Sequence, residues 1–269
     1  MFYFWCESLI FIPLQNNTFS GDFAGQNIII VDEVASTNDF LKAEASNFKP
    51  CDNFTAIMAR HQSKGRGQRD NSFHSAKGES LTFSFILFPK QLVVDDVFAI
   101  QTLISLSLHE WFSQYTDHCR IKWPNDMMLG DKKACGVLIE NTIKGQEIRY
   151  SIVGIGVNIG QREFPKDIAQ KATSLFLEVP GLTERPMEAH CADIISIIQQ
   201  KYANYWSEPE QMLSAYNELL YRKGQLTLFE ANGEVFEGSI SHVDKRGMLH
   251  IDHGTVMKPY YFKEVTLLR

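Results

Sequence analysis

The sequence ACGVLIENTIKGQEIRYSIVGIGV, residues 134–157, decides the fold of the chain. Its two apolar runs, 134–141 and 147–157, flank the pair Lys144-Gly145, a pattern that predicts two antiparallel strands joined by a hairpin turn. Working outward from this hairpin, the preceding sequence contains four more runs of strand-forming residues: 27–31, 54–59, 81–88 and 119–123. We therefore expect a mixed β-sheet at the centre of the molecule.

Four other segments show the spacing of amphipathic helices. The first follows Ser36 or Thr37, either of which would cap it, and the second spans residues 97–111. Two more, 186–206 and 209–222, each have proline near the start, where its missing N–H does no harm. Strands and helices in this order predict an α+β fold, with a mixed sheet flanked by helices.

The pattern changes after Arg222 to short alternating runs separated by turns. The runs cover residues 225–230, 235–243, 248–253 and 256–262. Such runs predict a small β-barrel of the SH3 type. We therefore divide the chain into an N-terminal arm (1–26), a catalytic domain (27–221) and a C-terminal SH3-like domain (222–269).

Composition excludes several classes of protein. The chain has 269 residues, 44% hydrophobic and 22% charged, which is typical of a folded globular protein. The formal net charge of -6 argues against a nucleic acid partner, and no apolar run reaches the roughly 18 residues of a membrane span. Five cysteines with no C-x-x-C pair indicate reduced thiols and a cytoplasmic location.

A polar, glycine-containing stretch, residues 60–80, interrupts the predicted sheet. Within it, Gln62-Ser63-Lys64-Gly65-Arg66-Gly67-Gln68-Arg69 combines two glycines with three basic side chains. Glycines let backbone N–H groups approach an anion, so this segment is a candidate anion cradle, although an exposed basic turn has the same composition. It matches neither the P-loop nor the dinucleotide-binding pattern.

Three further motifs place polar side chains beside predicted strands. Lys122-Trp123-Pro124-Asn125-Asp126 ends one strand, and Lys133 opens the next apolar run, 133–140. The third motif, residues 153–158, contains two glycines that could clear room beside a ligand. Taken singly, the first motif is better explained as a structural turn and Lys133 as a solvated lysine at a strand end, while the two glycines could also be mere strand irregularities.

Together, in this order, the motifs resemble those of the biotin protein ligase family. Ser36-Thr37-Asn38 is similar to its biotin-site S-T-N motif, and residues 62–69 resemble its adenylate-binding loop. Residues 122–126 have the family's K-W-P-N-D, residues 133–140 its K-x-x-G-[IV]-L-x-E, and residues 154–158 its G-x-G-[IV]-N. The similarity covers residues 27–177 and implies a catalytic domain of the biotin/lipoate ligase fold.

The resemblance implies a reaction and its residues. Biotin and ATP would form biotinyl-adenylate with Mg²⁺, and the biotin would pass to a lysine of a biotin carboxyl carrier protein, by a monomer or homodimer. Lys133 and Arg66 would be catalytic, and Asp126 would hold the metal. The substrate-binding residues would be Ser36, Thr37, Asn38, Gln62, Gly65, Arg66, Gly67, Gln68 and Gly136. The ATP-binding residues would be Trp123, Asn125, Asp126, Lys133 and Asn158.

The chain departs from the family pattern within the adenylate loop. Asp70 replaces a glycine, Phe73 a tryptophan and Gln68 an arginine found in many relatives. Two other functions stay open: a lipoate ligase or octanoyltransferase of the same fold, and a non-enzymatic biotin-sensing regulator. The sequence before residue 27 offers no helix-turn-helix of the kind that some relatives use to bind DNA.

Overall fold

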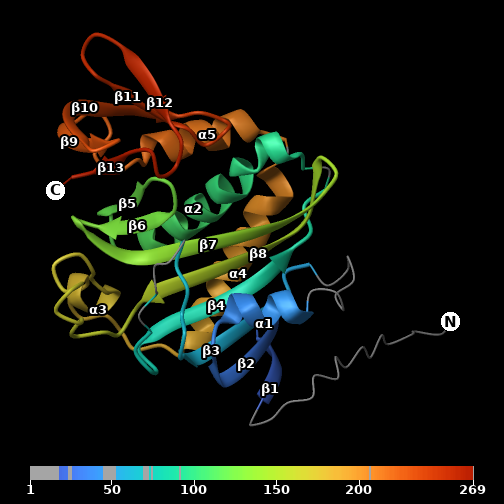
Figure 1. Ribbon diagram of the computed structural model, residues 1–269. Coiled ribbons are helices and arrows are strands. Elements are labelled where there is room, and N and C mark those ends of the chain that lie inside the picture. The colour runs from blue at the N-terminus through green and yellow to red at the C-terminus, as the bar shows by residue number, and fades with distance from the viewer. Residues whose placement is uncertain are drawn as a thin grey trace.

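A computed structural model describes residues 18–23, 26–44, 53–68, 73, 75–90, 92–205 and 207–268. Its centre is an eight-stranded sheet in the order β1-β2-β3-β4-β8-β7-β6-β5 (Figure 1). The strands are β1 (Thr18–Phe23), β2 (Gln26–Val34), β3 (Ala56–Gln62), β4 (Ser80–Leu87), β5 (Cys119–Lys122), β6 (Asp126–Leu129), β7 (Lys132–Lys144) and β8 (Glu147–Asn158). Only the β2–β3 pair of this sheet is parallel, so the expected mixed sheet is confirmed.

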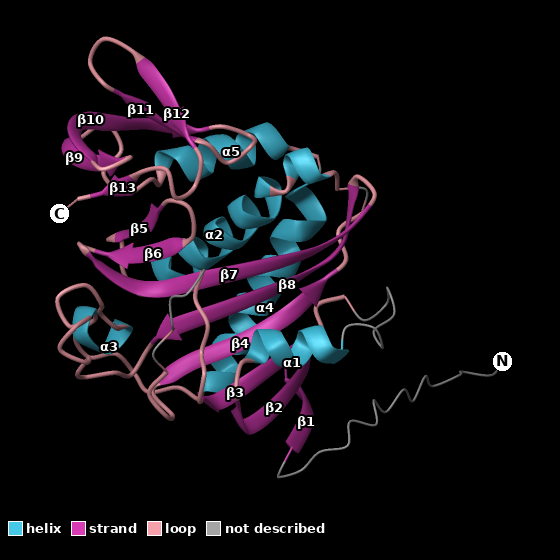
Figure 2. Ribbon diagram, in the orientation of Figure 1, coloured by secondary structure: helices cyan, strands magenta, loops and turns pink. Residues whose placement is uncertain are grey.

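Helices cover both faces of this sheet (Figure 2). The helical segments of the described residues are α1 (Thr37–Glu44), α2 (Phe98–Ser113), α4 (Met187–Tyr205) and α5 (Pro209–Glu218), with the short α3 (Leu175–Glu178) and the 3₁₀ turn η2 (Val94–Asp96). Helix α1 packs on one face of the sheet, and α2 and α4 pack on the other. Strand β2 shows the two layers directly. Its residues Ile28 and Ile30 belong to the large core that includes α2 and α4, whereas Ile29 and Val31 pack with Leu41 of α1.

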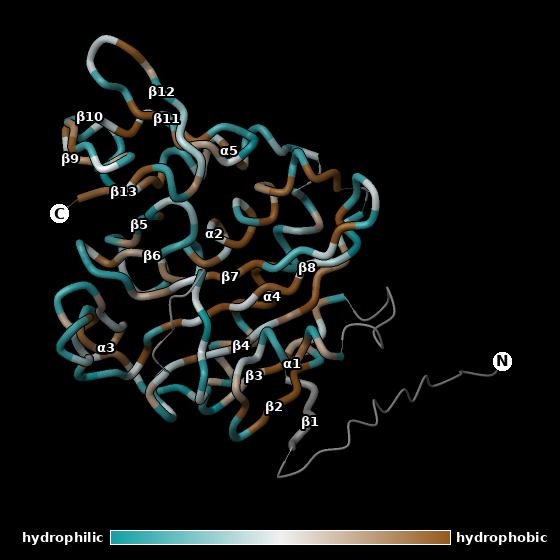
Figure 3. Tube along the Cα trace, in the orientation of Figure 1, coloured by the Kyte–Doolittle hydropathy of each residue, from teal (hydrophilic) through white to brown (hydrophobic). Residues whose placement is uncertain are grey.

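Apolar side chains fill the space between the layers. Figure 3 shows hydrophobic residues gathered on the central strands and on α4. All eight side chains of β4 are buried, which fits a strand covered by helices on both faces. Cys119, Cys135 and Cys191 are buried free thiols, and no helix in the described part of the chain is long and apolar enough to cross a membrane.

The C-terminal residues form a second sheet with the strand order β12-β11-β10-β9-β13. Its strands are β9 (Leu226–Ala231), β10 (Glu234–Val243), β11 (Leu249–Asp252), β12 (Met257–Tyr260) and β13 (Thr266–Leu267), paired antiparallel throughout. The sheet is open between its edge strands β12 and β13 in the described residues, so the predicted barrel closure is not confirmed.

The structure corrects several of the expected boundaries. Residues 18–23, assigned to the N-terminal arm, form strand β1 against β2. The fourth helix ends at Glu218 and not at Arg222, because the following residues pair with β5: Ile121 N donates to Leu219 O, and Tyr221 N donates to Ile121 O, at 2.9 and 2.8 Å. Strands β6 and β13 and helix α3 were not anticipated.

Candidate active site

A cleft of about 390 Å³ opens between the two sheets. It is bordered by the start of α1, the end of β3, the β5–β6 turn, strands β7 and β8, and the second sheet. Most of the site residues expected from the sequence meet there: Ser36, Thr37, Asn38, Gln62, Arg66, Gly67, Gln68, Trp123, Asn125, Asp126, Lys133 and Gly136. Residues from positions 36 to 136 are therefore combined in one cavity.

Two expected site residues lie outside the cleft lining. Gly65 connects two parts of its loop, because its carbonyl oxygen accepts a hydrogen bond from Phe73 N at 3.0 Å. Asn158 is buried and donates to Thr173 O at 2.9 Å, while its side-chain oxygen accepts from Gln161 Nε2 at 2.9 Å. In this arrangement both residues fix neighbouring segments of chain.

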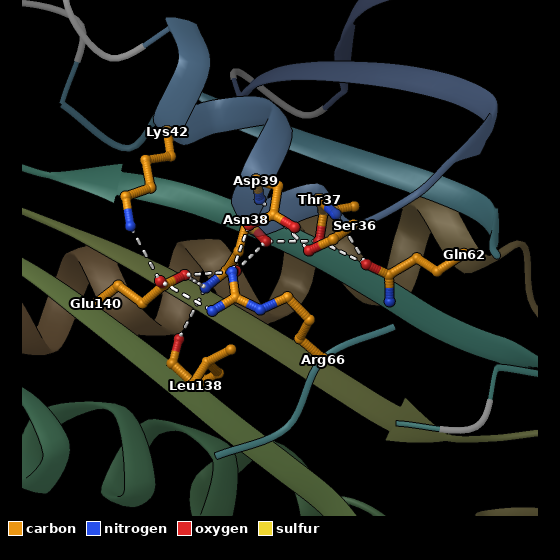
Figure 4. Close-up of polar contacts among 10 residues, drawn as sticks. Ser36, Thr37, Asn38, Asp39, Lys42, Gln62, Arg66, Leu138 and Glu140 are labelled. Carbon is orange, nitrogen blue, oxygen red and sulfur yellow. Dashed lines mark hydrogen bonds and ion pairs between the residues drawn. The ribbon is translucent and has the colours of Figure 1, made fainter. Parts of the chain in front are cut away.

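A buried polar network occupies the end of the cleft beside α1 (Figure 4). Gln62 Oε1 accepts from Thr37 N at 2.8 Å and from Thr37 Oγ1 at 3.1 Å. Ser84 Oγ lies 2.6 Å from both Thr37 Oγ1 and Asn38 Oδ1. Because these groups come from three elements, the start of α1, β3 and β4, the fold holds the polar atoms in fixed positions.

Ser84 was missed by the sequence analysis. It lies on β4, with a fully buried side chain and apolar neighbours on both sides in the chain. A hydroxyl between two phenylalanines of a predicted strand was the available signal, since buried polar groups need partners.

The two glycines of the third motif make room for side chains of the site. A Cβ on Gly154 would come within 2.1 Å of Asn38 Oδ1, and a Cβ on Gly156 within 2.6 Å of the Phe73 ring. Both glycines and the Phe73 ring line the cleft. The structure therefore favours close packing over strand irregularity as the reason for these glycines.

The opposite end of the cleft carries charge. Lys133 Nζ lies 2.6 Å from Asp126 Oδ1, and a Cβ on Gly136 would lie only 2.9 Å from the same ammonium. The backbone of Lys133 is fixed, because its N–H donates to Lys171 O at 2.8 Å and its carbonyl accepts from Thr173 N at 2.9 Å. The strand pair β6–β7 thus presents one cation and one carboxylate side by side.

A second group of charges lies near the basic loop. Arg66 pairs with Asp39 of α1 and with Glu140 of β7, the latter at 3.2 Å. Burial alone would raise the pKa of Glu140, but a hydrogen bond from Asn38 and the charges of Arg66 and Lys42 hold that pKa below its ordinary value. Glu140 is therefore a carboxylate at neutral pH, although sequence analysis did not place it in the site.

The second sheet supplies the remaining wall. Trp123 Nε1 donates to Gly247 O at 3.0 Å, and the Trp123 ring meets Phe262 edge-on with centroids 5.7 Å apart. The cleft residues of this sheet and its connections are Phe229, Ile240, Leu249, Phe262, Val265, Thr266 and Leu267. No motif marks them, because apolar residues of a cleft wall and of a sheet core look the same in sequence.

The described residues hold no cluster of three or more His, Cys, Asp or Glu side chains suited to a metal ion. Within the described part of the chain, Asp126 is the carboxylate that lines the cleft. A single carboxylate fits Mg²⁺ held mainly by substrate phosphates, because this ion keeps several waters and needs few protein ligands.

Comparison with known proteins identifies the family to which the chain is similar. The model of the biotin/lipoate A/B protein ligase family matches residues 31–158, and the chain belongs to this family. The bifunctional ligase/repressor BirA of Bacillus subtilis is 28% identical over 251 residues, covering 90% of this chain and 74% of that protein. Biotin–protein ligase 2 of Arabidopsis thaliana is 27% identical, covering 85% of this chain and 69% of that protein.

A solved structure shares most of this architecture. The biotin protein ligase from Aquifex aeolicus in complex with biotin and ATP superimposes with a TM-score of 0.74 at 25% identity. The match covers 90% of this chain and 99% of that chain. The similarity therefore extends over nearly the full length of both chains. Closure of the second sheet into a barrel is still not confirmed.

Proposed function

We propose that the protein is a biotin protein ligase, which forms biotinyl-adenylate from biotin and MgATP and then transfers the biotin to a lysine of a carrier protein. One observation carries this proposal above the others. A single cleft combines a polar pocket built on Thr37 and Gln62 with a charged end built on Asp126 and Lys133. A molecule with a polar head, an apolar tail and a terminal carboxylate fits such a cleft.

The polar pocket suits the neutral ureido head of biotin. The Thr37 hydroxyl and the Gln62 amide line the cleft and offer both donors and acceptors, at positions that Ser84 helps to fix. An octanoyl tail offers these groups neither a donor nor an acceptor, whereas the ureido head offers both. The network therefore favours biotin over the acyl group of a lipoate ligase or octanoyltransferase.

The charged end suits adenylate formation. The carboxylate oxygen of biotin attacks the α-phosphate of ATP, the bond to the β-phosphate breaks, and pyrophosphate leaves with the electron pair. The Lys133 ammonium would neutralise the charge that gathers between carboxylate and phosphate, an electrostatic form of catalysis. Asp126 would hold Mg²⁺, which when bound supplies positive charge to the phosphates, and Asn125 and Trp123 would help to place the nucleotide.

Transfer needs no nucleophile from the protein. The adenylate is an activated acyl donor, so the neutral amine of the carrier lysine attacks its carbonyl carbon and AMP leaves. The work of the protein is then to hold the two reactants together and to exclude water. We assign the catalytic steps to residues 27–221, with residues 222–269, an SH3-like unit by this proposal, completing the wall of the cleft.

The discriminating experiment measures pyrophosphate release with MgATP and each of three acids: biotin, lipoate and octanoate. We expect release with biotin to exceed release with the other two by at least a hundredfold at equal concentration. Preference for lipoate or octanoate would replace the proposal by the competing ligase. Biotin binding without any pyrophosphate release would favour a biotin-sensing regulator.

A further inference from the structure

One carboxylate, Glu140, touches both the polar pocket and the basic loop, and the proposed reaction gives it no role. It lies in strand β7, and its side chain is only 19% exposed. Asn38 Nδ2 donates to its Oε2 at 2.9 Å, and Arg66 Nη2 lies 3.2 Å from its Oε1 (Figure 4). Asn38 is buried directly beside Thr37 at the start of α1, whereas Arg66 lies in the loop after β3.

The Asn38 side of this bridge is rigid. Its side-chain oxygen accepts from Ser84 Oγ at 2.6 Å, and the space it fills exists because position 154 is glycine. A buried amide with partners on both of its ends has one orientation. Asn38 therefore fixes the position of the Glu140 side chain independently of the contact between Glu140 and Arg66.

The Arg66 side controls where the loop lies. Arg66, Gly67 and Gln68 are consecutive residues that line the cleft, so the guanidinium of Arg66 anchors the part of the loop that borders the site. Asp39, in the first turn of α1, supplies a second carboxylate to the same guanidinium. The two carboxylates neutralise much of the charge of this arginine, and their hydrogen bonds fix the position of the segment that carries it.

We infer that Glu140, together with Asp39, is a positioning residue that holds the Arg66–Gln68 segment against the cleft, and that the protein thereby retains biotinyl-adenylate. Arg66 then anchors this segment and does not itself neutralise the phosphate. The inference rests on the proposed function, because it names the adenylate as the molecule retained. It does not concern the polar pocket itself, where Thr37, Gln62 and Ser84 are joined to one another by hydrogen bonds that do not involve Arg66.

The test compares Glu140→Gln with Lys42→Gln, a control variant at a second cation that contacts the same oxygen of Glu140. Lys42 Nζ also lies near Glu140 Oε1, at 3.4 Å, but it belongs to α1, not to the loop. Glutamine keeps the size of the side chain and an oxygen for Asn38 while removing the charge that holds Arg66. For each variant, stopped-flow mixing gives the dissociation rate of biotinyl-adenylate, and calorimetry gives the affinity for biotin.

We expect Glu140→Gln and Arg66→Gln each to speed adenylate dissociation about tenfold, with biotin affinity changed less than twofold. The double variant should be no faster than either single variant, because the two changes remove one interaction. Lys42→Gln should match the wild type. Raising the salt concentration should speed release from the wild type and have little effect on Glu140→Gln, since exposed ion pairs are screened. Equal rates in Glu140→Gln and wild type, or multiplied effects in the double variant, would overturn the inference.

A second measurement needs no ligand, and it separates failure of this inference from failure of the proposed function. Trypsin cleavage after Lys64, followed by mass spectrometry on the whole folded chain, reports whether the segment is held. We expect faster cleavage at this bond in Glu140→Gln and in Asp39→Asn than in wild type and Lys42→Gln. Unchanged cleavage in both would contradict the anchoring role even if the wild type proved to activate another acid.

Discussion

At the scale of single residues, the pair Asp126–Lys133 is the place where the proposed chemistry is concentrated. Lys133 is about 39% exposed in its side chain and contributes little to any core, while its ammonium lies at the charged end of the cleft. We predict that Lys133→Ala lowers adenylate formation at least about a hundredfold, the usual cost of removing a group that stabilises transition-state charge. The measurement is pyrophosphate release with biotin and MgATP.

The neighbouring residue provides the control for this prediction. Lys132 is exposed on the same strand and does not line the cleft. Lys132→Ala should release pyrophosphate at the wild-type rate, and both variants should melt within a few degrees of wild type. Activity retained in Lys133→Ala would remove this lysine from the mechanism.

The polar pocket makes a separate prediction about affinity. Removing the Thr37 hydroxyl or the Gln62 amide leaves a polar atom of the biotin head without a partner, at about 1–3 kcal/mol. Thr37→Ala and Gln62→Ala should therefore each weaken biotin binding about tenfold or more in calorimetry. Thr37→Ser keeps the hydroxyl and should bind nearly as wild type. Wild-type affinity in both alanine variants would place the biotin head elsewhere.

At the scale of elements, helix α4 packs on α2 through a buried histidine. His190 is 2% exposed, its ring meets Trp111 edge-on at 5.6 Å, and Tyr115 Oη lies 3.4 Å from Nδ1. Burial, reinforced by the charge of Arg185 and partly offset by Asp193, lowers the pKa of His190 to about 4. The helix pair is thus built around a neutral imidazole.

This packing predicts a pH dependence of stability. An unfolded histidine titrates near pH 6.5, so between about pH 6.5 and 4 the unfolded state binds more protons than the folded state. The free energy of unfolding should therefore fall as pH drops through this window, by up to about 3 kcal/mol from this group. Urea titrations at pH 7.5 and 5.0 should show a smaller loss in His190→Gln than in wild type. An equal loss in both proteins would assign the effect to other groups.

How far elements can be predicted depends on their length and their neighbours. The hairpin β7–β8 was evident from two long apolar runs around Lys144-Gly145, because periodicity accumulates over many residues. Strand β6 has four residues, and β13 has two, too few for any pattern. Helix α5 was drawn too long because its last predicted residues pair with β5, a tertiary contact that local sequence does not encode.

The same distinction separates the site residues that were found from those that were missed. Thr37, Gln62, Asp126 and Lys133 are polar residues at strand or helix ends, where side chains gather at a cleft. Glu140 was visible within a motif, but its partner Arg66 lies 74 positions away, and only the fold brings the two together. The wall formed by the second sheet carries no sequence signal of its own.

At the scale of the whole molecule, the two sheets form one site. Gly247, in the connection between β10 and β11, accepts from Trp123 and packs on Phe98 of α2, where a Cβ would lie 2.5 Å from the ring. Its φ of +81° adds the backbone strain that any side chain would meet there. This position is therefore one of the points that attach the second sheet to the segments carrying Trp123 and α2.

Substitution of this glycine tests the connection against a matched turn. Gly254 has a similar φ of +86°, but a Cβ added there would meet nothing within 4 Å. Gly254→Ala should lower the free energy of unfolding by about 1–2 kcal/mol from backbone strain alone. Gly247→Ala should lose about 1–3 kcal/mol more from overpacking against Phe98, and should also raise KM for ATP by disturbing Trp123. Equal losses in the two variants would mean that the contact with Phe98 relaxes without cost.

The central claim is that this cleft joins biotin to a carrier lysine by way of an adenylate. Its most direct test incubates the protein with biotin, MgATP and a biotin carboxyl carrier domain and then measures the intact mass of the carrier. The account predicts a gain of one biotinyl group that requires biotin and MgATP together and is lost when the carrier's acceptor lysine is replaced by arginine. An unmodified carrier after full incubation with active wild-type protein, or a carrier that gains a lipoyl or octanoyl group in preference to biotin, would contradict it.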